Sequence, residues 1–175
     1  DEVVEPKSYL TLGTGTYATT ASIVKDTFVN LKSAKQAQLI LISPQDFLAA
    51  ASRLATYRNG QGTSALAVDI QEIFDEFNFG ITSPYAIRDF LAYTQSYWSS
   101  PTPTHVLLIG DGHYDPKNYR GYGRNSFIPP FLVFTDPWLG ETAADNRYVT
   151  FDGEGDRLPD MMIGRLSVNT NAEAD

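Results

Sequence analysis

Two carboxylates and an imidazole lie close together directly after an apolar run, in the stretch VLLIGDGHYDP, residues 106–116. These side chains belong to Asp111, His113 and Asp115. Such a group can hold a divalent cation or work as an acid and base pair, as in a metal-dependent hydrolase. However, Gly-Asp-Gly is a favourable turn sequence, and no nucleophile lies near His113 in the sequence. We therefore favour turn formation, and keep Asp111 and Asp115 as candidate calcium ligands.

A second acidic cluster occupies the stretch FDGEGDRLPD, residues 151–160. Alternating acids and glycines resemble the first half of a calcium-binding loop. An EF-hand would also need glycine at its sixth position and glutamate at its twelfth, where this sequence has Arg157 and Ile163. A looser calcium site is therefore the functional interpretation, and a solvated acidic turn is the alternative. The candidate ligands are Asp152, Glu154, Asp156 and Asp160.

The residues and motifs that other kinds of catalysis require are missing from this sequence. With no cysteine, disulfides, thiolate metal sites and a cysteine nucleophile are excluded. The G-x-S-x-G, H-E-x-x-H and G-x-x-x-x-G-K-[ST] motifs are absent. GTGTYA, residues 13–18, matches a dinucleotide fingerprint but lacks the acid that should end a second strand about 20 residues later. We expect no nucleotide cofactor and no catalytic residue, so the chain should be inactive alone.

Composition indicates a globular protein. Of 175 residues, 42% are hydrophobic and only 19% are charged, which suits one domain with a short extension. The net charge is -8 and the 13 basic residues are scattered, so we expect no nucleic-acid partner. No apolar stretch approaches the roughly 18 residues of a membrane span, so we expect no membrane insertion. Few lysines beside many Tyr, Asn, Thr and Gly favour a secreted or surface-exposed bacterial protein.

The elements that must position these residues follow from apolar runs and helix starts. QLILIS, SALAVDI and HVLLIGD predict buried strands, and Ser43-Pro44 and Ser83-Pro84 each predict a helix start. Apolar runs without alternation favour a mostly parallel sheet covered on both faces, hence a three-layer α/β fold. In such folds ligands bind beyond the carboxyl ends of the strands, where the Asp111 turn would lie.

The remaining segments are less regular. FLVFT predicts a possible fourth strand, ADNRYVTF an extended piece and DMMIGRL a last short strand. Residues 1–35 are Thr-rich and lack a helical period, which predicts an extended β arm or the end of an upstream β domain. Residues 36–175 form the predicted α/β domain.

Five phrases together resemble the gingipain-type cysteine peptidases of family C25 in order and spacing. They are AQLILISPQDFLAAASRLATYRNGQG, DIQEIFDEFNFGITSPYAIRDFLAYTQSYW, THVLLIGDGHYDPKNY, ETAADNRY and LPDMMIGRLSVNTNAEAD, covering roughly residues 36 to 175. The resemblance implies a Rossmann-like, caspase-like subdomain at the N-terminal side of the catalytic domain. In that family the histidine of a Gly-His-Gly phrase and the nucleophilic cysteine lie after the IGRL phrase, so they are expected downstream of Asp175.

The resemblance also implies partners and a site residue. The partners would be the C-terminal catalytic subdomain, in the same or a separate chain, and a polypeptide substrate. ADNRY matches a Ser-Asp-x-x-Tyr phrase whose aspartate, in arginine-specific gingipains, lies in the pocket for the basic substrate side chain. This implies Asp145 as a substrate-binding residue, with a turn role as the alternative. Calcium sites also occur in gingipains, and a catalytically dead module for binding or surface assembly is the second interpretation.

Overall fold

The computed structural model describes residues 22–175, apart from 23–24, 26–28, 34, 124–125 and 154. The GTGTYA stretch, most of the predicted arm at residues 1–35, and Glu154 lie outside the described residues. Within the described part of the chain, no helix is long and apolar enough to cross a membrane.

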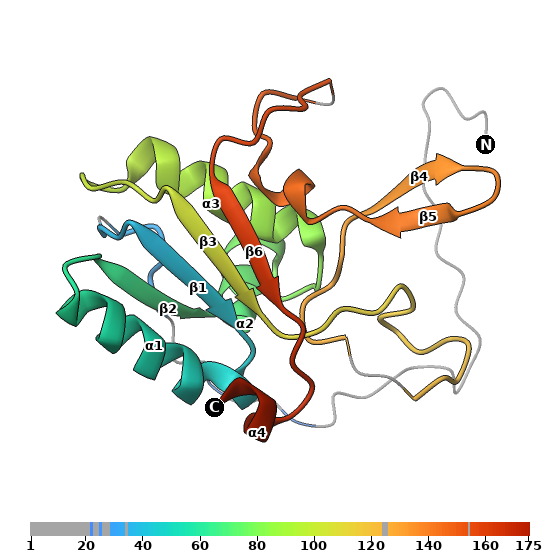
Figure 1. Ribbon diagram of the computed structural model, residues 1–175, viewed down its shortest axis with the longest axis horizontal. Coiled ribbons are helices and arrows are strands. Elements are labelled where there is room, and N and C mark those ends of the chain that lie inside the picture. Colours follow the sequence, from blue (N-terminus) through green and yellow to red (C-terminus); the bar gives the residue numbers. More distant parts are fainter. Residues whose placement is uncertain (1–21, 23–24, 26–28, 34, 124–125, 154) are drawn as a thin grey trace, which may run out of the picture.

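A parallel sheet of four strands forms the centre of the molecule, in the order β2-β1-β3-β6 (Figure 1). The strands are β1 (Leu39–Ser43), β2 (Ala65–Asp69), β3 (His105–Ile109) and β6 (Met162–Leu166). Each lies in one of the apolar runs identified in the sequence. Ile42 is in register with Val68 on one side and with Leu108 on the other. The predicted mixed α/β fold with a mostly parallel sheet is confirmed.

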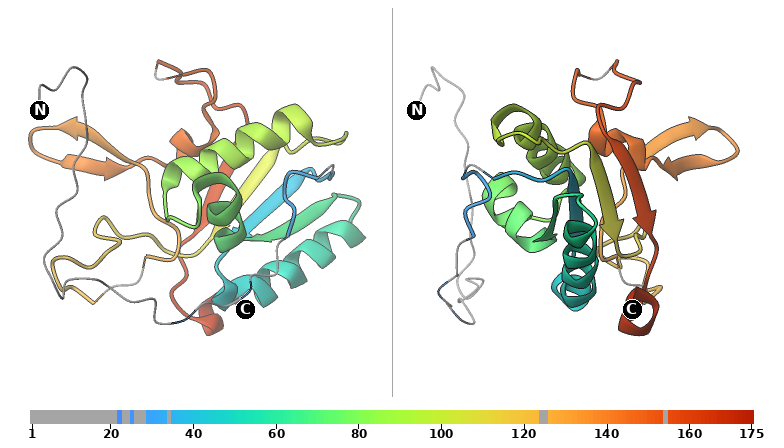
Figure 2. Two further views of the ribbon diagram at one scale, coloured as in Figure 1. Left: turned by 180° about the vertical axis from the view of Figure 1, so that it is seen from behind. Right: turned by 60° about the vertical axis from the view of Figure 1, so that its left-hand side comes forward.

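Helices lie on both faces of this sheet (Figure 2). The 3-10 turn η1 (Gln45–Phe47) and α1 (Leu48–Gly60) pack on one face, where Leu41 meets Ala51. On the other face lie α2 (Ile70–Asn78) and α3 (Pro84–Tyr97). Because successive residues of a strand point to opposite faces, Ile40 and Ile42 join the core beneath α2 and α3. The three-layer prediction is therefore confirmed.

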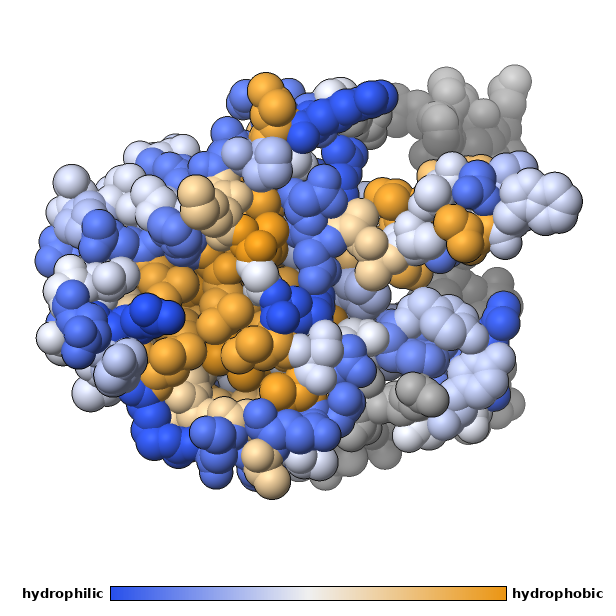
Figure 3. Space-filling model, in the orientation of Figure 1, coloured by the Kyte–Doolittle hydropathy of each residue, from blue (hydrophilic) through white to orange (hydrophobic). Residues whose placement is uncertain are grey.

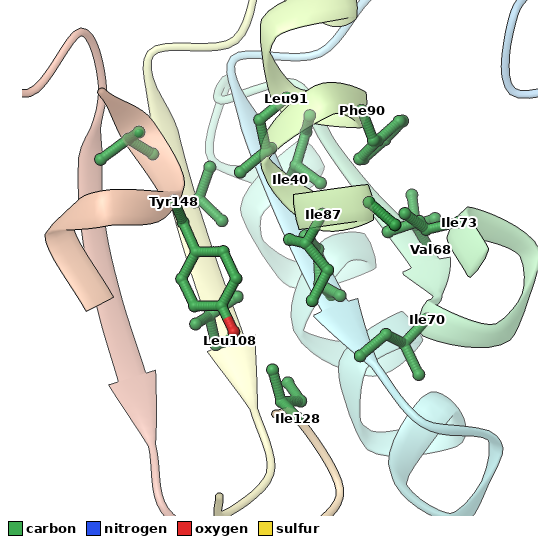
Figure 4. Packing of buried hydrophobic residues seen from close by; sticks show 14 of the residues in the cluster. Ile40, Val68, Ile70, Ile73, Ile87, Phe90, Leu91, Leu108, Ile128 and Tyr148 are labelled. Atoms are coloured by element: carbon green, nitrogen blue, oxygen red, sulfur yellow. The ribbon is translucent and has the colours of Figure 1, made fainter. Parts of the chain in front are cut away.

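The main core lies between the sheet and the α2–α3 layer (Figure 4). Its fully buried side chains include Ile40, Ile42, Ile73, Ile87, Phe90, Leu91, Leu108, Ile128 and Tyr148. Trp98 is 5% exposed and packs edge-on against Phe90, with ring centroids 5.8 Å apart. Its indole Nε1 donates a hydrogen bond of 3.1 Å to the carbonyl of Leu31. Leu31 belongs to this core although it precedes the predicted start of the domain at residue 36.

The two predicted Ser-Pro helix starts behave differently. Ser83 caps α3, because its hydroxyl accepts a hydrogen bond of 3.2 Å from the Tyr85 amide. Ser43 does not cap a helix. Its buried hydroxyl donates to the Pro44 carbonyl instead, and the first turn after Pro44 is 3-10 rather than α. The helical segment predicted after Ser43-Pro44 therefore exists, but the Ser43 side chain does not cap it as an N-cap serine would.

A hairpin extends beyond the β6 edge of the sheet (Figure 1). It consists of β4 (Leu132–Asp136) and β5 (Gly140–Ala143), which pair with each other and not with the main sheet. At its tip the Asp136 carboxylate accepts hydrogen bonds from the amides of Trp138 and Leu139, both 2.7 Å, and Trp138 is 95% exposed. The predicted fourth strand therefore exists, but as an arm.

Two short elements follow. The predicted extended piece ADNRYVTF contains the 3-10 helix η2 (Asp145–Val149), which buries the successive residues Tyr148 and Val149 beside α3. In an extended strand, neighbouring side chains point to opposite faces, so one of these two would be exposed. The prediction of an extended piece is therefore wrong, because both side chains are needed in the core. After β6, α4 (Asn171–Ala174) begins with a capping box between Thr170 and Glu173.

Candidate functional site

The loops at the carboxyl ends of β3 and β6 are joined to each other. The Asp111 amide donates to the Val168 carbonyl at 3.0 Å, and the Asn169 side-chain amide donates to Asp111 Oδ2 at 3.3 Å. Gly110 N also donates to the Leu166 carbonyl at 2.9 Å. This is the edge of the sheet at which the sequence predicts a functional loop.

Asp111 forms the turn that starts this loop. Its Oδ1 accepts from the Gly112 amide at 2.9 Å, and its carbonyl accepts from the amides of Phe127 and Ile128 at 3.0 and 3.2 Å. A Cβ atom on Gly112 would lie only 2.6 Å from the Ile128 carbonyl oxygen. The turn is therefore pressed against residues 127–128, and only glycine fits at its second residue.

Asp115 organises the next part of the loop. It is 6% exposed, and its carboxylate accepts from the amides of Tyr119 at 2.9 Å and Arg120 at 2.7 Å. The hydrogen bond from the Arg120 amide, assisted by that from Tyr119, holds the pKa of Asp115 below its usual range, although burial opposes the change. The Asp115 amide donates to His113 Nδ1 at 3.2 Å, so this histidine also serves the turn.

The three predicted metal or acid-base residues of this loop do not converge on one point. The His113 ring packs against Tyr114 and Tyr122, with centroids 4.6 and 6.0 Å away. Among the described residues, no group of three or more His, Cys, Asp or Glu side chains could hold a metal ion. The carboxylates of Asp111 and Asp115 bind backbone amides instead, and metal binding by them stays a prediction.

The second acidic loop has a similar internal structure. Asp156 accepts from the amides of Leu158 at 3.0 Å and Asp152 at 3.2 Å, and these bonds, led by that from Leu158, lower the pKa of Asp156. Asp160 Oδ2 accepts from the Phe151 amide at 2.9 Å. The carboxylates of Asp156 and Asp160 thus fix the course of the loop. Its calcium site, which would include Glu154 outside the described residues, stays a prediction.

Asp145 forms an ion pair that the sequence did not suggest. Arg165 of β6 donates from Nε and Nη2 to its two carboxylate oxygens, at 2.7 and 2.8 Å. The Arg165 side chain is only 11% exposed, and its Nη1 also donates to the carbonyls of Gly110 and Ile128 at 3.0 and 3.2 Å. Burial lowers the pKa of Arg165, but the hydrogen bonds and charge of Asp145 raise it by more.

This pair changes what Asp145 can do as a substrate-binding residue. A substrate cation would have to share a carboxylate whose two oxygens already accept from Arg165. Arg165 is a site residue that the sequence motifs did not indicate. Its signal was a charge within the apolar phrase DMMIGRL, because a buried cation needs an anionic partner.

The architecture matches that of two solved structures. A chain of dimeric latent PorU from Porphyromonas gingivalis superposes with a TM-score of 0.68 at 27% sequence identity, covering 82% of this chain and 15% of that one. A second structure, described as a protease, matches with a TM-score of 0.53 at 17% identity, covering 79% of this chain and 26% of that one. The second likeness concerns the fold alone. A comparison with curated protein sequences found no match.

The sequence phrases and the structural likeness agree with the model of one protein family. The model described as Peptidase family C25 matches residues 32–175, which include the whole parallel sheet and all the loops described above. The chain spans a small fraction of the length of the structures it resembles. This chain therefore belongs to peptidase family C25, the family of the gingipain-type cysteine peptidases.

Proposed function

We propose that this chain is the non-catalytic, N-terminal subdomain of a gingipain-like cysteine endopeptidase and contributes part of the substrate cleft. The observation that carries the proposal is a C25 fold over residues 32–175 in a chain with no cysteine. Peptide hydrolysis by this class needs a thiolate activated by an imidazole. The polypeptide that completes the domain would supply both groups. The peptidase itself would be secreted or held at the bacterial cell surface, and its substrate would be a polypeptide.

The contribution to the cleft would come from the loops beyond β3 and β6. Hydrogen bonds between Asp111, Val168 and Asn169 hold the two loops together. The Arg165 side chain also donates a hydrogen bond to the Gly110 carbonyl in the turn after β3. Loops held by several bonds to the sheet keep their shape, as a surface that must orient a peptide beside a nucleophile requires. The subdomain would thus position substrate and leave bond cleavage to its partner.

The test is an assay of the polypeptide that contains this chain together with the rest of the C25 domain. Turnover of a fluorogenic peptide and labelling by a thiol-reactive peptidyl inhibitor are expected for that polypeptide, and neither for residues 1–175 alone. A continued reading frame without a Gly-His-Gly phrase and a later cysteine would overturn the peptidase assignment. It would support the second candidate, a catalytically dead C25 module used for binding or surface assembly, which the exposed Trp138 at the hairpin tip favours.

Asp145 gives the finer test of the cleft. If its carboxylate binds a basic substrate side chain beside Arg165, Asp145→Asn in the complete peptidase lowers kcat/KM for peptides with arginine before the cleaved bond. Peptides with an uncharged residue there serve as the control. An equal loss for both peptide classes would assign Asp145 to structure alone.

Calcium binding is tested separately. Because a cation bound only by the folded state must stabilise it, calcium would raise the Tm of the chain and a chelator would lower it. The candidate ligands are Asp111, Asp115, Asp152, Glu154, Asp156 and Asp160. Equal Tm values in calcium and chelator would remove calcium from the proposal without affecting the peptidase assignment.

A further inference from the structure

The loop after β3 presents a group of exposed aromatic side chains. Tyr114, Tyr119 and Tyr122 are 49%, 82% and 53% exposed. The Tyr114 and Tyr122 rings have centroids 6.1 Å apart, and both lie beside the His113 ring. Tyrosine combines a large apolar ring with a polar hydroxyl and is therefore enriched where proteins bind other molecules. We call residues 113–123 the tyrosine loop, and its exposed rings mark an interaction surface.

The charge of the tyrosine loop is opposite to that of the chain. Its two basic residues, Lys117 and Arg120, are both exposed, and the Arg120 guanidinium lies 5.7 Å from the centroid of the Tyr114 ring. Its one acid is Asp115, which is buried and whose carboxylate accepts two backbone amides. The loop therefore presents cations and no exposed carboxylate, although the net charge of the chain is -8.

Hydrogen bonds within the tyrosine loop fix its shape. Besides the bonds to Asp115, the Asn118 carbonyl accepts from the Gly121 amide at 3.1 Å, and Asn118 Oδ1 accepts from the Gly123 amide at 3.0 Å. Asn118 has a φ of 52°, a left-handed conformation that asparagine tolerates better than most residues. A surface that is ordered before binding loses little conformational entropy when a ligand arrives, so this loop is suited to recognition.

The tyrosine loop stands out from the carboxyl ends of β3 and β6 (Figure 1). In the space-filling view it forms a group of pale and blue residues, separate from the apolar surface over the sheet (Figure 3). The Asp111 turn, which we assign to the substrate cleft, leads directly into this loop. A polypeptide that enters the cleft from this side would therefore contact the tyrosine loop.

We propose that the tyrosine loop binds an acidic segment of the polypeptide substrate, so that the peptidase prefers substrates with Asp or Glu residues near the cleaved bond. The Arg120 guanidinium and the Lys117 ammonium pair with the substrate carboxylates, and the tyrosine rings contact the apolar parts of the same segment. The net negative charge of the rest of the chain repels such a segment, which directs it to the loop. This inference rests on the proposed function and adds the chemistry of the substrate.

A titration of the chain followed by two-dimensional NMR tests this binding. The probe is a peptide of alternating glutamate and glycine, and its control has glutamine in place of each glutamate. The glutamate peptide should shift the amide signals of residues 113–123, and added salt should weaken the effect because it screens exposed charges. The double variant Lys117→Gln/Arg120→Gln should bind the peptide about tenfold more weakly. Arg58→Gln, which removes an exposed cation from α1 instead, should bind like the parent.

Several results of this titration would overturn the proposal. They are signals of residues 113–123 that the glutamate peptide leaves unmoved, equal shifts with the two peptides, and a double variant that binds like the parent. An oligothymidylate that binds these residues as tightly as the glutamate peptide would also overturn it. The loop would then be a site for any polyanion, because nucleic acids too bind surfaces that combine cations with aromatic rings.

The complete peptidase gives a second readout. Two fluorogenic peptides with the same cleaved bond are compared, one with glutamates on both sides of the bond and one with glutamines there. The acidic peptide should have a kcat/KM about threefold higher, through a lower KM, because the loop contributes binding rather than chemistry. The double variant should bring the two peptides to the same kcat/KM, and Arg58→Gln should keep the difference.

Equal kcat/KM values for the two peptides in the parent, or a preference that the double variant retains, would contradict the proposal. A polypeptide that cleaves neither peptide would count against the proposed function alone, because the NMR titration needs no catalysis. The two proposals can therefore fail separately.

Discussion

Arg165 connects more of the molecule than any other charged residue described above. Its guanidinium joins β6 to η2 through Asp145 and to the turn after β3 through the Gly110 and Ile128 carbonyls. Tyr148 lies beside the pair, and burial raises its pKa well above the usual range, so it stays uncharged. In this largely buried pair, two hydrogen bonds join the guanidinium to the carboxylate. Removing either side chain would leave the other charge buried without its partner, which lowers the stability of the fold.

Removal of the Asp145 carboxylate should therefore destabilise the fold. Asp145→Ala leaves the Arg165 cation largely buried without an anion, which should lower the free energy of unfolding by about 3 kcal/mol. Urea denaturation measures this change. The control is Arg53→Ala, which breaks the exposed pair with Asp175 and should cost about 0.5 kcal/mol or less. Equal losses for the two variants would show that the Asp145–Arg165 pair contributes little.

The lowered pKa of Asp115 predicts an acid-sensitive loop. Because the folded state lowers this pKa below its ordinary value of 3.8, the unfolded chain binds the proton first as the pH falls. The stabilisation is present above about pH 4 and is lost progressively below it. Asp115→Asn should reduce stability at pH 7 and flatten the decline in stability as the pH falls below about 4. Parallel stability curves for the two proteins, measured by urea denaturation, would contradict this role.

At the scale of elements, the turn after β3 depends on close contact between two loops. Gly112 lies against the Ile128 carbonyl and near the Arg165 guanidinium, so the turn, the 127–128 segment and β6 are packed as one unit. A side chain at this position would push these segments apart, and with them the loops that we assign to the cleft.

Gly112→Ala should accordingly destabilise the protein by about 1–3 kcal/mol, the usual cost of overpacking. The matched control is Gly60→Ala at the end of α1, where an added Cβ meets nothing within 4 Å. That variant should be neutral or up to about 1 kcal/mol more stable, because alanine favours the helix. Thermal denaturation followed by circular dichroism compares the two. A neutral Gly112→Ala variant would show that the turn can relax.

At the scale of the whole molecule, the sequence predicted what depends on local pattern. The runs QLILIS and HVLLIGD became neighbouring parallel strands because strands buried on both faces need apolar residues throughout. The family phrases predicted C25 membership, which the family model confirms. Ser83 capped its helix because all parts of that signal lie within three residues.

What depends on distant partners could not be predicted in the same way. Arg165 and Asp145 lie 20 residues apart in the sequence, and nothing local marks them as a pair. The FLVFT segment has the composition of a strand, but which strand it pairs with depends on the course of the loops around it. Ser43 and Ser83 are both followed by proline. Ser43 is buried, however, and its hydroxyl donates to the Pro44 carbonyl instead of capping a helix.

The contrast between the two tryptophans has a use in the laboratory. Trp98 is enclosed in the core and Trp138 stands in water at the hairpin tip, with exposures of 5% and 95%. Their emission should therefore separate, with a blue-shifted component shielded from acrylamide and a red-shifted component that acrylamide quenches. Trp138→Phe should remove the quenched component and leave Trp98 as the single tryptophan, whose emission, excited selectively at the red edge of the absorption band, reports unfolding of the core. If a partner binds the hairpin tip, the red-shifted emission of Trp138 should change while that of Trp98 stays the same. Trp138 is therefore a built-in fluorescent probe for binding at the hairpin.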